Sequence, residues 1–177
     1  MKRKTILLSM LLACIISTAK TVIVETHNIS LVIDATEGKA PQYIYFGAKL
    51  QSGDADRLQK PCADGRMDAY PAYGMNTPAE AAIALRHSDG NMSTELTVTG
   101  TEQTAEKNGT VTRIHLKDPK YAFTVDLCYK AYNDVDIIET WTEIKNNEKG
   151  SVNLTQFASA MLPIRRGHLV PAAVGFC

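Results

Sequence analysis

The sequence predicts an all-β fold, an antiparallel sandwich of two packed sheets. The first observation is a period-two alternation: in the stretch YAFTVDLCYKAY, Phe123, Val125 and Leu127 fall on one face of a strand. Thr124 and Asp126 fall on the other face, as in a half-buried antiparallel strand. The second observation is that turn-forming clusters such as SDGN, KNG and NNEKG separate such segments. Short strands joined by polar turns are typical of a sandwich.

Strands are expected, in chain order, at residues 22–26, 30–34, 42–46, 82–87, 92–98, 110–117, 121–131, 136–145 and 151–162. A helix is an alternative to a strand only in the stretch TPAEAAIALRH, where Thr77 and Glu80 have the spacing of a capping box. Because this stretch runs directly into the SDGN turn and the next strand, we expect its second half to be a strand.

Residues 51–68, QSGDADRLQKPCADGRMD, form the longest stretch without periodicity. Turn-forming residues dominate it. Loops of this length are uncommon inside compact domains, and they are usually functional or disordered.

The first nineteen residues have the pattern of a secretory signal peptide. A basic start is followed by an apolar run at residues 6–16 and by small residues that lead to a cleavage site after Ala19. A membrane anchor needs about 20 apolar residues, and this run is shorter. We expect the mature chain to be secreted or periplasmic and free of the membrane. Acylation of Cys14, as in a lipoprotein, is the alternative.

Removal of the signal makes the chain mildly acidic. The whole chain has 19 basic and 19 acidic side chains, and the signal holds three of the bases, which leaves 16 bases against 19 acids. This balance gives no electrostatic reason to expect a nucleic-acid partner. Cys62, Cys128 and Cys177 remain, without CxxC spacing, so neither a disulfide framework nor a zinc site is indicated. One bridge among the three is the alternative to free thiols.

No motif of a catalytic or cofactor site is present. The sequence lacks GxSxG, GxxxxGK[ST], GxGxxG and HExxH, and its four histidines are widely separated. Paired carboxylates of the kind that glycosidases use occur as Asp54/Asp56, Asp64/Asp68 and Asp134/Asp136. All three pairs lie in turn-like sequence, where nothing holds two carboxylates about 5 Å apart. We therefore interpret them as turn residues and expect no metal and no cofactor.

Aromatic side chains offer another kind of site. Tyr70 and Tyr73 lie beside Pro71, directly after the long loop. Together with Trp141 they would form a platform on which sugar rings can stack. Since Trp141 lies in the middle of an expected strand, we expect it in the core instead.

Two long stretches have an order of motifs found in a known family. In AYPAYGMNTPAEAAIALRHSDGNMSTELTV, residues 69–98, a Tyr-Pro-x-Tyr-Gly turn leads to a strand, an H-x-D-G turn and another strand. In DLCYKAYNDVDIIETWTEIKNNEKGSVNLTQFASAML, residues 126–162, a strand runs into an NN hairpin and returns with an Ala-Ser-x-x-Leu pattern. Both stretches resemble the N-terminal domain of bacterial α-galactosidases of glycoside hydrolase family 36, and the resemblance extends over residues 21–164.

The resemblance implies a galactose-mutarotase-like β-supersandwich over residues 20–166, the part that precedes a catalytic (β/α)₈ barrel. Such enzymes remove terminal α-galactose from raffinose-type oligosaccharides with retention, using aspartates in a Lys-Trp-Asp and a Ser-Asp-x-x-Asp motif. Neither motif occurs in this sequence, and a barrel needs about 250 residues. We therefore expect a fragment that is inactive by itself, with residues 167–177 as an aberrant or truncated tail.

In the family, a loop ahead of the Tyr-Pro turn can approach the active site of a neighbouring subunit. The corresponding residues 51–68 do not match the family residue for residue. Position and chemistry select Arg66, Asp68, Tyr70 and Tyr73 as substrate-adjacent residues, because arginine and carboxylate groups can bind sugar hydroxyls and tyrosine can stack beside them.

Expected partners are an α-galactoside oligosaccharide in the parent enzyme, the catalytic barrel and further copies of the chain. The alternatives are a stand-alone carbohydrate-binding module and a structural or oligomerisation partner of a separately encoded barrel.

Overall fold

The structure, a computed structural model, describes residues 21–58 and 67–162 of the chain. In that part, the chain order is β1 (Thr21–Glu25), β2 (Ile29–Asp34), β3 (Gln42–Ala48), the 3₁₀ turn η1 (Ala55–Arg57), β4 (Ile83–Arg86), β5 (Thr97–Glu106), β6 (Gly109–Lys117), β7 (Phe123–Tyr132), β8 (Ile138–Asn146) and β9 (Asn153–Phe157). The all-β prediction is confirmed. Within these residues, no helix is long and apolar enough to cross a membrane.

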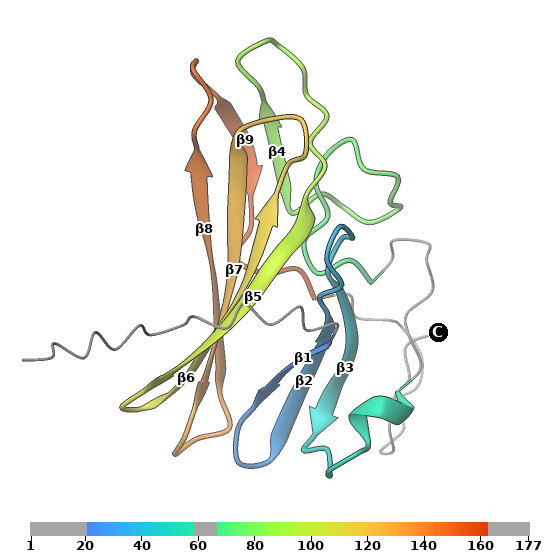
Figure 1. Ribbon diagram of the computed structural model, residues 1–177, viewed down its shortest axis with the longest axis vertical. Helices are drawn as coiled ribbons and strands as arrows, with labels where there is room; N and C mark the ends of the chain where they lie inside the picture. The colour runs from blue at the N-terminus through green and yellow to red at the C-terminus, as the bar shows by residue number, and fades with distance from the viewer. Residues whose placement is uncertain (1–20, 59–66, 163–177) are drawn as a thin grey trace, which may run out of the picture.

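The strands form three sheets (Figure 1). The largest has the order β5-β6-β7-β8, a meander in which each strand pairs antiparallel with the next. The sheet β1-β2-β3 is built in the same way and lies beside it, and β4 pairs with β9. Hairpin connections between consecutive strands explain why the turn clusters in the sequence are short and polar.

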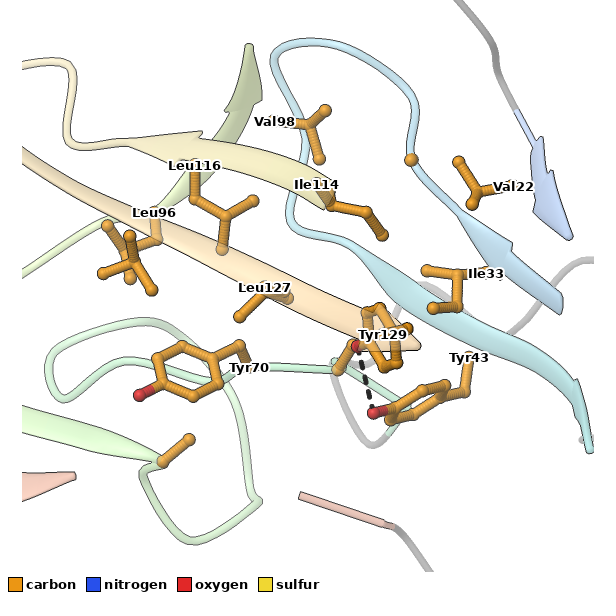
Figure 2. Packing of buried hydrophobic residues seen from close by; sticks show 14 of the residues in the cluster. Val22, Ile33, Tyr43, Tyr70, Leu96, Val98, Ile114, Leu116, Leu127 and Tyr129 are labelled. Atoms are coloured by element: carbon orange, nitrogen blue, oxygen red, sulfur yellow. Dashed lines mark hydrogen bonds between the residues drawn. The ribbon is translucent and has the colours of Figure 1, made fainter. Parts of the chain in front are cut away.

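The main core lies between the four-stranded sheet and the three-stranded sheet, with β4 closing it. Figure 2 shows Ile33 from the smaller sheet and Leu127 from the larger sheet among its members, and both are buried. The hydroxyls of Tyr43 and Tyr129 meet at 3.3 Å inside this core. Burial raises the pKa of both tyrosines, so both stay neutral and each hydroxyl has a partner where water is excluded.

The expected strand at residues 92–98 is wrong for most of its length, since β5 begins only at Thr97. The backbone N–H of Thr94 donates to the Tyr73 carbonyl, and that of Glu95 donates to the Asp118 carboxylate, instead of to a neighbouring strand. Leu96 is buried without belonging to a strand. The alternation there reflects an extended segment packed on the core.

β4 confirms the strand expected in the second half of the stretch TPAEAAIALRH, and residues 77–81 form no helix. The structure also corrects two other expectations. β9 is shorter than the expected strand at residues 151–162. Trp141 is half-buried rather than a core residue. It pairs with Cys128 on the face of the four-stranded sheet opposite to Leu127, because side chains alternate along a strand.

Candidate functional site

The segment after the long loop runs along the edge of β3. The Tyr43 N–H donates to the Met67 carbonyl at 2.9 Å, and the Ala69 N–H donates to the Pro41 carbonyl at 2.8 Å. Met67 and Ala69 are buried. The apolar Met67 and the small Ala69 let the backbone pass close to the core. This path of the backbone sets the positions of the neighbouring candidate residues.

The segment turns the predicted substrate-adjacent residues in different directions. Asp68 is buried, and its Oδ1 accepts a hydrogen bond from Gln42 Nε2 at 2.9 Å. The Tyr70 ring is in the core, and its hydroxyl donates to the Ala158 carbonyl at 3.0 Å (Figure 2 shows the ring). Tyr73 is 50% exposed. Arg66 lies outside the described residues.

Of the tyrosines in this segment, only Tyr73 can therefore meet a ligand from solvent. Burial raises the pKa of Tyr70, more than its hydrogen bonds to Thr142 and Ala158 lower it. The Tyr70 hydroxyl thus acts as a neutral donor that connects the segment to the end of β9.

A tight turn holds Tyr73 in place. The Tyr73 N–H donates to the Ile83 carbonyl at 2.9 Å, and its carbonyl accepts from the Thr94 N–H at 2.9 Å. The next residue, Gly74, has φ +95°, a left-handed conformation that glycine adopts without strain. A Cβ at Gly74 would lie 2.7 Å from the Ser93 Cα. The glycine of the motif is therefore required by backbone geometry.

The beginning of the long loop is packed on the outer face of the three-stranded sheet. Leu50 and Leu58 pack against a small cluster made of Val32, Ile44 and Tyr45. The Leu50 N–H also donates to Ser30 Oγ at 3.0 Å. The loop thus leaves β3 from a fixed anchor, and residues 59–66 lie outside the described part of the chain.

A buried polar cluster joins two turns that are far apart in the sequence. His87 is 2% exposed; its Nδ1 lies 2.7 Å from Glu148 Oε1, and its Nε2 lies 3.1 Å from Thr94 Oγ1. Ser88 donates to Glu148 Oε2 from both its N–H and its hydroxyl. The Tyr121 ring stacks on the imidazole at 3.5 Å.

Sequence reasoning missed this cluster, since it treated His87 as an isolated histidine and no motif relates residues 87 and 148. Burial would raise the pKa of Glu148, but the hydrogen bonds from His87 and Ser88 hold it below the ordinary value. The hydrogen bonds of Glu148 to His87 and Ser88 connect the two turns, so the cluster has a structural role. We call this link the clamp between His87 and Glu148.

Two members of the carboxylate pairs, Asp54 and Asp136, accept hydrogen bonds from turns. Asp136 accepts hydrogen bonds from Thr26 Oγ1 at 2.8 Å, from the Asn28 N–H at 2.8 Å and from Asn28 Nδ2 at 2.7 Å. Asp54 accepts from the Gln51 N–H. Among the described residues, no group of three or more His, Cys, Asp or Glu side chains has the arrangement of a metal site.

β9 and the described residues after it are exposed or half-exposed and carry several apolar side chains. All side chains of β9 are exposed, and Leu154 and Phe157 are 38% and 66% exposed. Leu162, further along the chain, is 56% exposed. Exposed apolar side chains that gather on one strand mark a surface that another part of a protein covers.

The fold and these sites define an antiparallel β-sandwich domain, in which the polar groups of the turns stabilise the fold. The chain belongs to the glycosyl hydrolase family 36 N-terminal domain family, whose model matches residues 39–170. No curated protein matched the chain.

Solved α-galactosidases of glycoside hydrolase family 36 share the fold. The A355E variant of AgaA from Geobacillus stearothermophilus has 17% sequence identity and a TM-score of 0.67, over 80% of this chain and 24% of that chain. The galactosidase domain of the α-galactosidase-sucrose kinase AgaSK has 19% identity and a TM-score of 0.68, with the same coverage. The Lactobacillus brevis enzyme has 14% identity and a TM-score of 0.67, over 79% of this chain and 23% of that chain. The chain thus spans about a quarter of the length of the enzymes that it resembles.

Proposed function

We propose that the chain is the N-terminal domain of an α-galactosidase that hydrolyses terminal α-galactosides of raffinose type. The observation that carries this proposal is the family match over residues 39–170, together with the shared fold. Structures of Geobacillus stearothermophilus AgaA variants include complexes with raffinose and stachyose. These oligosaccharides define the substrate class of the proposal.

In this proposal, the catalytic aspartates belong to a barrel domain outside this chain. The sequence contains neither of the two family motifs that carry them. Asp68 and Asp136 are engaged within the fold by Gln42 and by Asn28. The chain alone is therefore inactive toward α-galactosides.

The surface of β9 and the residues after it is the proposed contact with the barrel. Leu154, Phe157 and Leu162 remain exposed in the described fold, and burial of their remaining apolar surface would stabilise the contact. For the substrate-adjacent role, the exposure of Tyr73 favours it over Asp68 and Tyr70, which are buried. Arg66 stays a proposed partner of substrate hydroxyls, from a loop that would face a neighbouring subunit.

The proposal includes export of the chain. Cleavage after Ala19 would leave Lys20 as the first residue, directly ahead of β1. Mass spectrometry of the mature protein tests this point, with an N-terminus at Lys20 as the expected result. An intact Met1, or a diacylated Cys14, would contradict it.

The DNA that follows the codon for Cys177 tests the proposed function. Translation in all three frames is expected to yield a barrel-sized sequence with a Lys-Trp-Asp motif, followed by a Ser-Asp-x-x-Asp motif. A neighbouring gene that encodes a separate barrel would support the alternative of a two-chain enzyme. If neither exists, the domain does not belong to an α-galactosidase.

A further inference from the structure

The outer face of the four-stranded sheet carries the single tryptophan of the chain. The strand register places four side chains in one row across the sheet: Glu102 on β5, Arg113 on β6, Cys128 on β7 and Trp141 on β8. This row faces away from the core, whose neighbouring members, such as Leu127, point to the opposite side.

The row is organised around Trp141. Its indole Nε1 donates to Glu143 Oε1 at 3.1 Å. Glu143 follows Trp141 by two residues on β8, so it lies on the same face. Cys128 is 1% exposed although it faces away from the core, so the longer side chains around it cover its thiol. Burial raises the pKa of this thiol to about 12. The centre of the face therefore holds a covered, neutral thiol beside a half-buried aromatic ring, and both groups contact the Glu143 carboxylate.

Charged groups surround this centre in a fixed arrangement. Arg113 lies between two carboxylates, 3.4 Å from Glu102 Oε1 and 3.8 Å from Glu143 Oε1. Both carboxylate side chains remain exposed, at 41% and 51%, while the Arg113 side chain is 29% exposed. Exposed ion pairs of this kind contribute little to stability. They do present acceptors and donors of hydrogen bonds at defined positions beside the ring.

This combination matches the chemistry of a galactopyranoside. The axial 4-hydroxyl leaves the hydrogens on C3, C4 and C5 exposed on one face of the sugar ring, and that face stacks on an aromatic side chain. The hydroxyls at the rim are donors and acceptors that suit carboxylates and a guanidinium group.

We propose that the outer face of the four-stranded sheet is a non-catalytic binding site for terminal α-galactosides, with Trp141 as the stacking platform and Arg113, Glu102 and Glu143 as hydroxyl ligands. The choice of galactosides rests on the proposed function. The site itself is distinct from the segment that holds Tyr73. It would keep a soluble oligosaccharide close to the enzyme between catalytic events.

Because Trp141 is the only tryptophan, its fluorescence reports on this site directly. The mature chain is titrated with methyl α-galactoside and melibiose, and with methyl α-glucoside as the epimer that has an equatorial 4-hydroxyl. The expected result is a saturable fluorescence change with the galactosides, with Kd on the order of 1 mM. We expect binding of the glucoside to be at least about tenfold weaker, since it lacks the axial hydroxyl and the matching apolar face.

Two variants separate the site from general effects. Arg113→Gln should weaken galactoside binding about tenfold through loss of a charged donor. Lys49→Gln, which changes an exposed ion pair on the three-stranded sheet, should leave binding unchanged. If Arg113→Gln does not fold, Trp141→Phe followed by calorimetry replaces it, with a measurable loss of affinity as the expected result.

The proposal is overturned if the galactosides produce no saturable change, if the glucoside binds equally well, or if folded Arg113→Gln binds like the unchanged chain. These results are independent of the DNA test of the proposed function. A barrel-coding sequence without galactoside binding would contradict only the surface site. Binding without any barrel-coding sequence would contradict only the assignment to an α-galactosidase.

Discussion

Glu148 is the carboxylate with the clearest effect on the fold. Its two oxygens accept from His87 and Ser88, and these contacts connect the turn after β4 with the turn after β8. Its side chain is 6% exposed. A buried carboxylate with all its partners stabilises a fold, but its removal leaves those partners unsatisfied.

Replacement of Glu148 by Ala should lower the free energy of unfolding by about 1–3 kcal/mol, because it leaves buried donors without an acceptor. Urea unfolding monitored by circular dichroism measures this change. Glu106→Ala, at an exposed pair with Lys130, is the matched control, with an expected loss below about 1 kcal/mol. Equal losses for the two variants would contradict the clamp.

The same group makes stability depend on pH. The folded pKa of Glu148 is lowered from its ordinary value of 4.5, so the native state binds this proton less tightly than the unfolded state does. Its contribution is present above pH 4.5 and is lost as the pH falls through the folded pKa. Glu148→Gln should flatten this acid-side loss in unfolding midpoints measured between pH 3 and pH 7. An unchanged slope would show that other carboxylates cause it.

Tyr70 and Tyr73 differ in role despite their proximity in the sequence. Tyr70→Phe removes the hydroxyl that donates to the Ala158 carbonyl. The free energy of unfolding should fall by only about 0.5–1.5 kcal/mol, because Thr142 Oγ1 still donates to that carbonyl at 3.3 Å. Tyr73→Phe, at a half-exposed ring, should leave stability unchanged. Urea unfolding of both variants measures the two changes. A larger loss of stability for Tyr73→Phe than for Tyr70→Phe would contradict the structural role of the Tyr70 hydroxyl.

At the scale of elements, the Tyr-Pro-x-Tyr-Gly turn shows how a short motif encodes geometry. Gly74 and Gly90 both have positive φ, but only Gly74 lies against other atoms. Gly90→Ala should therefore lower the free energy of unfolding by about 1 kcal/mol through backbone strain alone. Gly74→Ala should lower it by about 1–3 kcal/mol more than Gly90→Ala does, because its Cβ would contact the Ser93 backbone. Thermal unfolding compares the two variants, and equal midpoints would contradict the contact.

Most strands could be predicted from the sequence, because one of their faces is buried. β7 is the clearest case, with Val125 and Leu127 alternating with polar residues. The far half of β5 could not be predicted, since the residues after Thr101 are exposed or half-exposed on both faces and alternation is lost. Its pairing with β6 is fixed by backbone hydrogen bonds, which leave no pattern in the side chains.

The candidate sites were less predictable than the strands. The segment after the long loop could be singled out from its Tyr-Pro-x-Tyr-Gly motif. The burial of Asp68 and Tyr70 in it, however, depends on contacts with Gln42 and Ala158. The clamp between His87 and Glu148 joins residues 61 positions apart. Trp141 was expected in the core because it lies in the middle of an expected strand, whereas the register turns it outward. In each case, the deciding contact is distant in the sequence.

At the scale of the whole molecule, the domain has a well-packed core and an exposed last strand. The core between the sheets is complete around Val125 and Ile114, which are 0% exposed. β9 and the residues after it expose Leu154, Phe157 and Leu162. These exposed apolar side chains are the surface that the proposed contact with a barrel domain would cover.

Hydrolysis of an aryl α-galactoside by the purified mature chain tests the central claim most directly. We predict no release of the aryl group above the uncatalysed rate, because the sequence contains neither of the two family motifs that carry the catalytic aspartates. A family 36 α-galactosidase assayed in parallel confirms that the conditions support turnover. Turnover by the chain that is lost on Asp68→Asn or Asp136→Asn would contradict the account, since it would place catalysis within the sandwich itself.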